Sequence, residues 1–134
     1  MDALYPRLLV ADFDTAAAFW ERALRDLLGI EPVKLLPEAG YANWDLDGEA
    51  VLVLFSRSAI AKAVGTDALP AVPAAQDSAM LVLRVPQVDE ATDRLTSHGA
   101  AVVSPPQDRP DWGPGLRTAH LRTPDGTLVE LQSY

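Results

Sequence analysis

The chain has 134 residues, of which 49% are apolar and 22% are charged, and its formal net charge is −8. This length suits one compact domain with a buried core, so we expect residues 1–134 to form a single domain. The acidic balance disfavours nucleic acid, because phosphate binding draws on clustered Lys and Arg. It would suit a cationic ligand, although acidic surfaces commonly serve solubility alone.

The chain lacks cysteine, which excludes disulfides and thiolate metal sites. No apolar run approaches the length of a membrane span. The first residues, Met1-Asp2-Ala3-Leu4, do not show the basic region and apolar stretch of a secretion signal. We therefore expect a cytoplasmic protein with no membrane and no nucleic-acid partner.

The first half of the chain predicts a strand, a helix and a strand meander. Asp14 is the predicted N-cap of the helix, apolar residues recur at helical spacing after it, and Gly29 ends it. The turn signals Glu38-Ala39-Gly40 and Asp47-Gly48 separate the strands of the meander. The predicted elements are a strand at 4–10, a helix at 14–28 and strands at 32–36, 41–46 and 51–55.

The second half repeats this order after a connecting segment. An Ala-rich helical patch is predicted at 58–64, and the rest up to residue 78 is typical of a linker. Four prolines around Trp112 predict a loop over 104–115. The predicted elements are a strand at 80–85, a helix at 88–98 and strands at 101–103, 116–122 and 127–132.

An internal repeat relates the two halves. The segment that begins at Val10 aligns with the segment that begins at Val85, a constant offset of 75 residues. In each half a turn dipeptide, Asp47-Gly48 or Asp125-Gly126, leads into an apolar strand. We therefore predict module one at 1–56, a linker at 57–78 and module two at 79–134.

Three motifs resemble the vicinal oxygen chelate superfamily, which includes glyoxalase I, extradiol dioxygenases, and fosfomycin- and bleomycin-resistance proteins. They are Val10-Ala11-Asp12 at the junction of strand and helix, Phe19-Trp20 within the helix, and the Pro124-Asp125-Gly126 turn before a strand that carries Glu130. The resemblance implies an α+β fold of two tandem βαβββ modules, whose curled mixed sheets surround a central cavity. It also implies a homodimer.

Catalytic members of that superfamily hold a divalent metal with one residue from the first strand and one from the last strand of each module. The resemblance places these positions at Tyr5, Val53, Met80 and Glu130. Only Glu130 is a competent ligand for a hard or borderline cation. We therefore expect no metal and no other cofactor, which is the pattern of the bleomycin-resistance proteins.

The positions around these four predict a pocket for a small molecule. Side chains alternate along strands, so Arg7 shares a face with Tyr5. The resemblance to fosfomycin-resistance proteins places Thr118 and His120 on the cavity side, and aromatic walls are expected from Tyr41 or Trp44 and from Trp112. The predicted ligand-binding residues are Tyr5, Arg7, Trp44, Val53, Met80, Trp112, His120 and Glu130, and no residue is assigned a catalytic role.

Three functions are open at this point. The first is a metal-free protein that sequesters an antibiotic-like or aromatic metabolite. The second is a lyase, isomerase or dioxygenase that uses a metal, or a catalyst that uses His120 and Glu130 as a proton-transfer pair. The third is an interaction module whose dimer surface matters. Structural roles are also open, because Glu130 could pair with Arg7 or Arg84 and His120 could be an ordinary strand residue.

Overall fold

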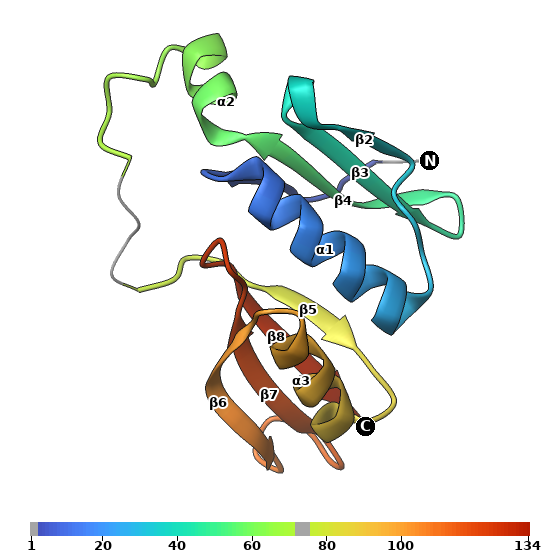
Figure 1. Cartoon of the computed structure of the whole chain (residues 1–134). Helices are drawn as coiled ribbons and strands as arrows, with labels where there is room; N and C mark the ends of the chain where they lie inside the picture. The colour runs from blue at the N-terminus through green and yellow to red at the C-terminus, as the bar shows by residue number, and fades with distance from the viewer. Residues whose placement is uncertain (1–2, 72–75) are drawn as a thin grey trace. The chain divides into compact units, whose positions relative to one another are not determined.

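The computed structural model describes residues 3–71 and 76–134. The chain divides into two compact units, residues 1–73 and 74–134. Each unit holds one four-stranded mixed sheet with a helix against one face (Figure 1). The strand orders are β1-β4-β3-β2 and β5-β8-β7-β6. The predicted α+β fold of two tandem βαβββ modules is confirmed.

The first unit follows the predicted order of elements. Its first strand is parallel to its fourth, and the other pairs are antiparallel. The first strand starts at Arg7, later than the residue 4 predicted from sequence. The elements are β1 (Arg7–Val10), α1 (Phe13–Leu28), β2 (Lys34–Leu36), η1 (Pro37–Ala39), β3 (Tyr41–Leu46), β4 (Glu49–Ser56) and α2 (Arg57–Val64).

Helix α1 begins at a different aspartate from the one predicted. The N-cap is Asp12, whose carboxylate accepts from the backbone N–H of Thr15 at 3.1 Å and from its hydroxyl at 2.8 Å. Asp14 lies in the first turn instead. An N-cap carboxylate accepts a hydrogen bond from the backbone N–H three residues later in the chain. For Asp12 that residue is Thr15, whose hydroxyl donates a second hydrogen bond to the same carboxylate. For Asp14 it is Ala17, which has no side-chain donor. The predicted end at Gly29 is confirmed, in the left-handed conformation with φ 67°.

The second unit repeats the topology of the first. Its parallel pair joins its first and last strands, and its other pairs are antiparallel. The elements are β5 (Leu81–Arg84), α3 (Val88–Ser97), β6 (Ala101–Asp108), β7 (Arg117–Arg122) and β8 (Leu128–Ser133).

Strand β6 is longer than predicted and contains two prolines. The sequence predicts a strand only to Val103, yet pairing with β7 continues to Asp108. Pro105 and Pro106 fall in the irregularity between the pairs that Ser104 and Gln107 make with β7. Because β6 is an edge strand, these prolines remove no central ladder hydrogen bond. A proline-rich stretch can therefore form a strand at this position.

The predicted linker at 57–78 is partly structured. Helix α2 occupies its first part, near the predicted helical patch. Asp77, close to its end, accepts two bonds at 2.9 Å from the guanidinium of Arg122 on β7. Residues 72–75 of the predicted linker lie outside the described residues. Met1 and Asp2, the first residues of the N-terminal segment that lacks a secretion signal in the sequence analysis, also lie outside them.

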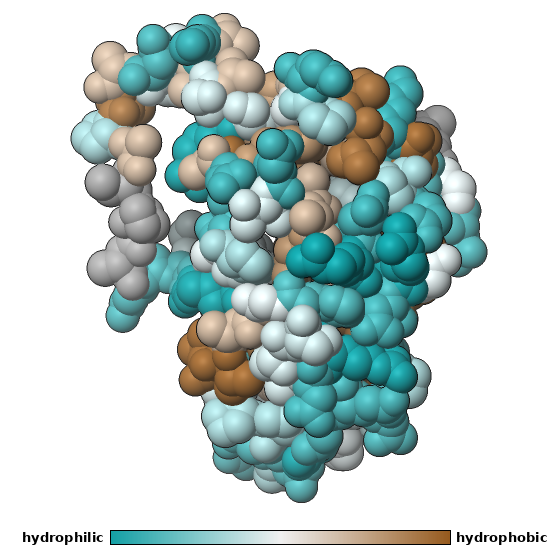
Figure 2. Space-filling view, in the orientation of Figure 1, coloured by the Kyte–Doolittle hydropathy of each residue, from teal (hydrophilic) through white to brown (hydrophobic). Residues whose placement is uncertain are grey.

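Each sheet buries most of its large apolar residues on the face that its helix covers. In the first unit the fully buried side chains include Phe19, Trp44 and Leu54, and in the second Leu95, Leu121 and Leu131. The visible surface is mostly hydrophilic, with an apolar patch over β6, where Val102 and Val103 are exposed (Figure 2). Among the described residues, none of the helices combines the length and apolar character needed to cross a membrane.

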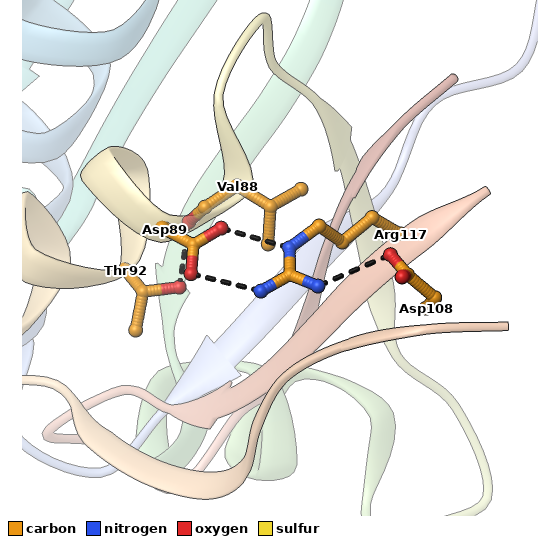
Figure 3. A network of polar contacts seen from close by, with 5 residues as sticks. All are labelled: Val88, Asp89, Thr92, Asp108 and Arg117. Carbon is orange, nitrogen blue, oxygen red and sulfur yellow. Dashed lines mark hydrogen bonds and ion pairs between the residues drawn. The ribbon is translucent and has the colours of Figure 1, made fainter. Parts of the chain in front are cut away.

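An arginine clamp ties α3 to the sheet of the second unit (Figure 3). Arg117 on β7 donates to both carboxylate oxygens of Asp89, at 2.8 and 3.0 Å, and to Asp108 on β6 at 3.1 Å. Asp89 lies in the first turn of α3, which has no side-chain N-cap bond. The bidentate pair therefore anchors a helix end that lacks a side-chain cap, where a negative charge also complements the helix dipole.

We predict that the two faces of the second sheet differ in their contribution to stability. Val129 on β8 is 1% exposed, whereas Val82 on the neighbouring β5 is 51% exposed. Val129→Ala removes buried methyl groups and leaves a cavity, so it should lower the free energy of unfolding by about 1–3 kcal/mol. Val82→Ala should change it by less than about 0.5 kcal/mol. Urea unfolding of both variants measures the difference, and equal losses would contradict this assignment of the core.

The Asp89 clamp should make stability depend on acid pH. The hydrogen bonds from Arg117 hold the pKa of Asp89 below its ordinary value of 3.8. A carboxyl whose pKa is lower in the folded state stabilises the fold above its unfolded pKa, and this contribution is lost as the pH falls through the folded value. Asp89→Asn should therefore lower the unfolding midpoint at pH 7, with a difference from wild type that shrinks below pH 3.8.

The matched control for this clamp is Glu90→Gln. Glu90 lies in the same helical turn but pairs with Arg94 of its own helix and not with the sheet. Its replacement should shift the midpoint less at pH 7 than Asp89→Asn does. Thermal unfolding at pH 7, 5 and 3 compares the two variants, and a difference between Asp89→Asn and wild type that persists unchanged at the lowest pH would refute the role of this carboxylate.

Candidate functional site

The strand register sets which side chains share a face with the predicted site. Val53 on β4 stands opposite Arg7 on β1, and Glu130 on β8 stands opposite Val82 on β5. Arg7 and Val82 are separated by the internal offset of 75 residues. Val53 and Glu130 therefore occupy equivalent positions in the two units, as the repeat predicts.

The predicted site residues of the first unit lie in different environments. Tyr5 precedes β1 and is partly exposed, and the guanidinium of Arg7 lies 5.8 Å from the ring centroid of Phe55. Val53 is buried on the same sheet face as Arg7. Trp44 pairs with Leu52 and therefore points to the opposite face, where it is 0% exposed. The structure thus places Trp44 in the core and not with the other predicted site residues.

In the second unit the structure brings His120, Glu130 and Trp112 together. His120 on β7 stands directly opposite Glu130 on β8, and its Nε2 lies 2.8 Å from Glu130 Oε1. Gln132 donates from Nε2 to the other carboxylate oxygen at 3.0 Å. The side chains of His120 and Glu130 are only 12% and 8% exposed. In the His120 tautomer with hydrogen on Nε2, each oxygen of the Glu130 carboxylate accepts one hydrogen bond. One comes from His120 on the neighbouring strand β7, and the other comes from Gln132 on β8 itself.

The pairing of Glu130 differs from the structural alternative considered from sequence. Its two oxygens are bound by His120 and Gln132, whereas Arg84 stacks on Tyr134 at 4.4 Å from the ring centroid. Met80, the remaining predicted residue of this unit, precedes β5 and is exposed. The local polar centre of the second unit is thus a chain of histidine, glutamate and glutamine.

The loop between β6 and β7 folds over the same face. Trp112 stands edge-to-face with His120, with ring centroids 6.2 Å apart, and remains 57% exposed. Arg109 lies with its guanidinium carbon 4.3 Å from the centroid of Trp112. Backbone bonds from Arg109 N–H to Leu116 O and from Trp112 N–H to Arg109 O hold this loop in a tight turn. An exposed aromatic ring therefore lies beside the buried polar chain.

Sequence reasoning missed Arg109 and one of its two hydroxyl partners, Ser104. Arg109 donates from Nε to Thr118 Oγ1 at 3.1 Å and from Nη2 to Ser104 Oγ at 3.3 Å. Thr118 was expected on this face, but Arg109 and Ser104 fall in the predicted proline-rich loop. The available signal was the spacing of Arg109 and Trp112, which places a cation and an aromatic ring one turn apart.

The donors at the four family metal positions do not fit a divalent cation. Tyr5 offers a phenol that would have to ionise, Val53 offers only carbon atoms, and Met80 offers a soft thioether. Glu130 alone carries a hard donor, and each of its oxygens accepts a hydrogen bond from a side chain of the same sheet. Within residues 3–71 and 76–134, no group of three or more His, Cys, Asp or Glu side chains is placed to hold a metal ion. These positions therefore do not form a site for a divalent cation.

Comparison with known proteins identifies the family. The family described as Glyoxalase/Bleomycin resistance protein/Dioxygenase superfamily matches residues 4–131. The YraH protein of Bacillus subtilis (strain 168) is 35% identical over 131 residues, which is 98% of this chain and 97% of that protein.

Solved structures show the same fold. A glyoxalase-related enzyme from Fulvimarina pelagi is 21% identical with a TM-score of 0.75, over 98% of this chain and 87% of that one. TioX from Micromonospora sp. ML1 is 25% identical with a TM-score of 0.59, over 98% and 94%. The family match over residues 4–131 and the 35% identity to YraH show that this chain belongs to the glyoxalase/bleomycin resistance protein/dioxygenase superfamily.

Proposed function

We propose that this protein is a metal-free small-molecule binding protein of the bleomycin-resistance type, which sequesters an antibiotic-like or aromatic metabolite. The observation that carries the proposal is the hydrogen bonding of Glu130, the family metal position. Its carboxylate is held on both oxygens by His120 and Gln132 and is nearly buried. A carboxylate committed in this way serves the protein's own structure, and the equivalent Val53 cannot replace it as a ligand.

Trp112 supplies the surface on which a planar ligand would stack. Its ring is more than half exposed, yet it is fixed by His120 at its side and by Arg109 over its face. A rigid aromatic residue gives contact area at a low cost in conformational entropy. The neighbouring His120 adds a polar ring beside this surface, and a few polar groups next to an aromatic wall are the usual composition of a small-molecule site.

The contact of His120 with Glu130 also bears on the enzyme alternative. An imidazole and a carboxylate 2.8 Å apart can exchange a proton, as the alternative requires. However, the second oxygen of Glu130 accepts a hydrogen bond from Gln132. The carboxylate is therefore held in place by two side chains, which suits a structural role better than proton transfer to a substrate. We therefore favour binding over catalysis. A cytoplasmic location and a homodimer remain predictions within this proposal.

Ligand binding should report through Trp112 alone among the three tryptophans. Trp20 and Trp44 are 2% and 0% exposed, whereas Trp112 is 57% exposed. Titration with a panel of planar aromatic compounds and bleomycin-type antibiotics should therefore change the intrinsic fluorescence of the wild type, and this change should disappear in Trp112→Phe. Trp112→Ala should weaken binding about threefold to tenfold through the loss of stacking.

Trp20→Phe is the control for this titration, because it removes a tryptophan of the other unit and should leave the fluorescence response intact. Binding of Trp112→Phe itself is followed by titration calorimetry, and it should stay close to that of the wild type. An unchanged fluorescence signal with the whole panel would count against the proposed function.

Metal should have no part in this binding. Protein purified without chelator should contain substoichiometric amounts of Ni, Fe, Mn and Zn by elemental analysis, because the donors at the family positions do not suit these cations. Treatment with EDTA should leave the ligand affinity unchanged. A stoichiometric metal that is lost in Glu130→Gln would overturn the metal-free assignment.

A further inference from the structure

Arg109 is a half-buried cation whose partners are all neutral. Its guanidinium donates to the hydroxyls of Thr118 and Ser104, at 3.1 and 3.3 Å, and lies against the ring of Trp112. In the described part of the chain it makes no ion pair with a carboxylate. The N–H groups on its Nη1 atom are likewise without a hydrogen-bond partner among those residues. A half-buried guanidinium without an anionic partner keeps donors available to a bound ligand.

The acidic groups near Arg109 in the chain and on its sheet are engaged elsewhere or lie exposed. Asp108, the preceding residue, is bound by Arg117. Glu130 is bound by His120 and Gln132. Asp111 is exposed. The four other arginines of this unit behave differently, because Arg94, Arg117 and Arg122 each bind a carboxylate and Arg84 is exposed.

We propose that Arg109 binds an anionic group, a carboxylate or another planar oxyanion, on the aromatic ligand that stacks on Trp112. This inference rests on the proposed function and defines its ligand more closely. The hydroxyls of Thr118 and Ser104 fix the plane of the guanidinium through Nε and Nη2 and leave the N–H groups of Nη1 unused. A planar donor fork fixed in this way recognises a carboxylate through charge-assisted hydrogen bonds.

The proposal reverses the expectation drawn from net charge. A chain of net charge −8 suits a cationic ligand over its surface as a whole. At a half-buried site the nearby N–H donors of Arg109 outweigh the field of the distant surface carboxylates. That field is screened within about 10 Å at moderate salt. The ligand class that follows is an aromatic acid, and the acidic surface would slow its approach without preventing binding.

A matched series of three ligands tests the proposal. The probes are 2-naphthoate, the neutral 2-naphthamide and the cationic 2-naphthylmethylammonium, which share one aromatic body. NMR titration of the wild-type protein should show 2-naphthoate bound about tenfold more tightly than the amide, with the ammonium compound weakest. In Arg109→Gln the preference for naphthoate over the amide should disappear, while the affinity for the amide changes little.

Two further variants separate recognition from a structural role of Arg109. Arg109→Lys keeps the charge but loses the planar arrangement of N–H donors, so the preference for naphthoate over the amide should fall several-fold without vanishing. This variant also tests the role of Arg109 if Arg109→Gln does not fold. Arg94→Gln removes the same charge from helix α3, which lies on the face of the sheet opposite to Glu130. It should leave the preference for naphthoate intact. If Arg109 served only to hold the loop, its replacement would lower the unfolding temperature and leave the ratio of naphthoate to amide affinity unchanged.

The outcomes distinguish the two proposals. Equal binding of all three probes would overturn the role of Arg109 and leave the proposed function standing. A preference for naphthoate that survives in Arg109→Gln, or that is lost equally in Arg94→Gln, would also overturn it. Binding of none of the three at about 1 mM would count against both.

Discussion

The buried carboxylate of Glu130 is the constraint on which the chemistry of the second unit depends. A carboxylate with an almost fully buried side chain is strongly destabilising unless its oxygens are bound. Here β7 supplies His120 directly opposite and β8 supplies Gln132 two residues on, so the sheet itself provides both partners. Each oxygen of Glu130 therefore already accepts a hydrogen bond from within the sheet. The position keeps an acidic residue, but the residue acts as the centre of a hydrogen-bond chain.

The tandem repeat shows how one topology supports two different surfaces. The positions of Val53 and Glu130 are equivalent by register, yet one is an apolar core residue and the other a polar centre. The backbone hydrogen bonds of the two sheets are alike, because strand pairing does not depend on which side chain stands at either position. Function therefore resides in the side chains that each unit places on the common frame.

Much of the fold could be predicted from sequence, because strand alternation, helical spacing and turn residues act locally. Gly29, the Asp47-Gly48 turn and the repeat itself identified elements that the structure contains. The errors came where competing local signals were close in strength. Asp12 and Asp14 are both able to cap a helix, and the bond from Thr15 decides between them. The prolines of β6 predicted a loop, since a sequence does not show which strand lies at an edge.

The candidate site was less accessible to sequence because its geometry depends on a loop. Alternation placed His120 on the face of Glu130, but no local rule brings Arg109 back over Thr118 from nine residues away. Trp44 was predicted to line the site, but it is buried in the core. A tryptophan on a strand suits either face of a sheet, and only its register with Leu52 assigns it to the core face. The turn that returns Arg109 also fixes Trp112 beside His120, so one loop conformation determines the cation, the aromatic surface and the access to the polar chain. Changes in that loop would alter this surface without disturbing the sheet, because loops on a common frame vary more freely than the strands that carry them.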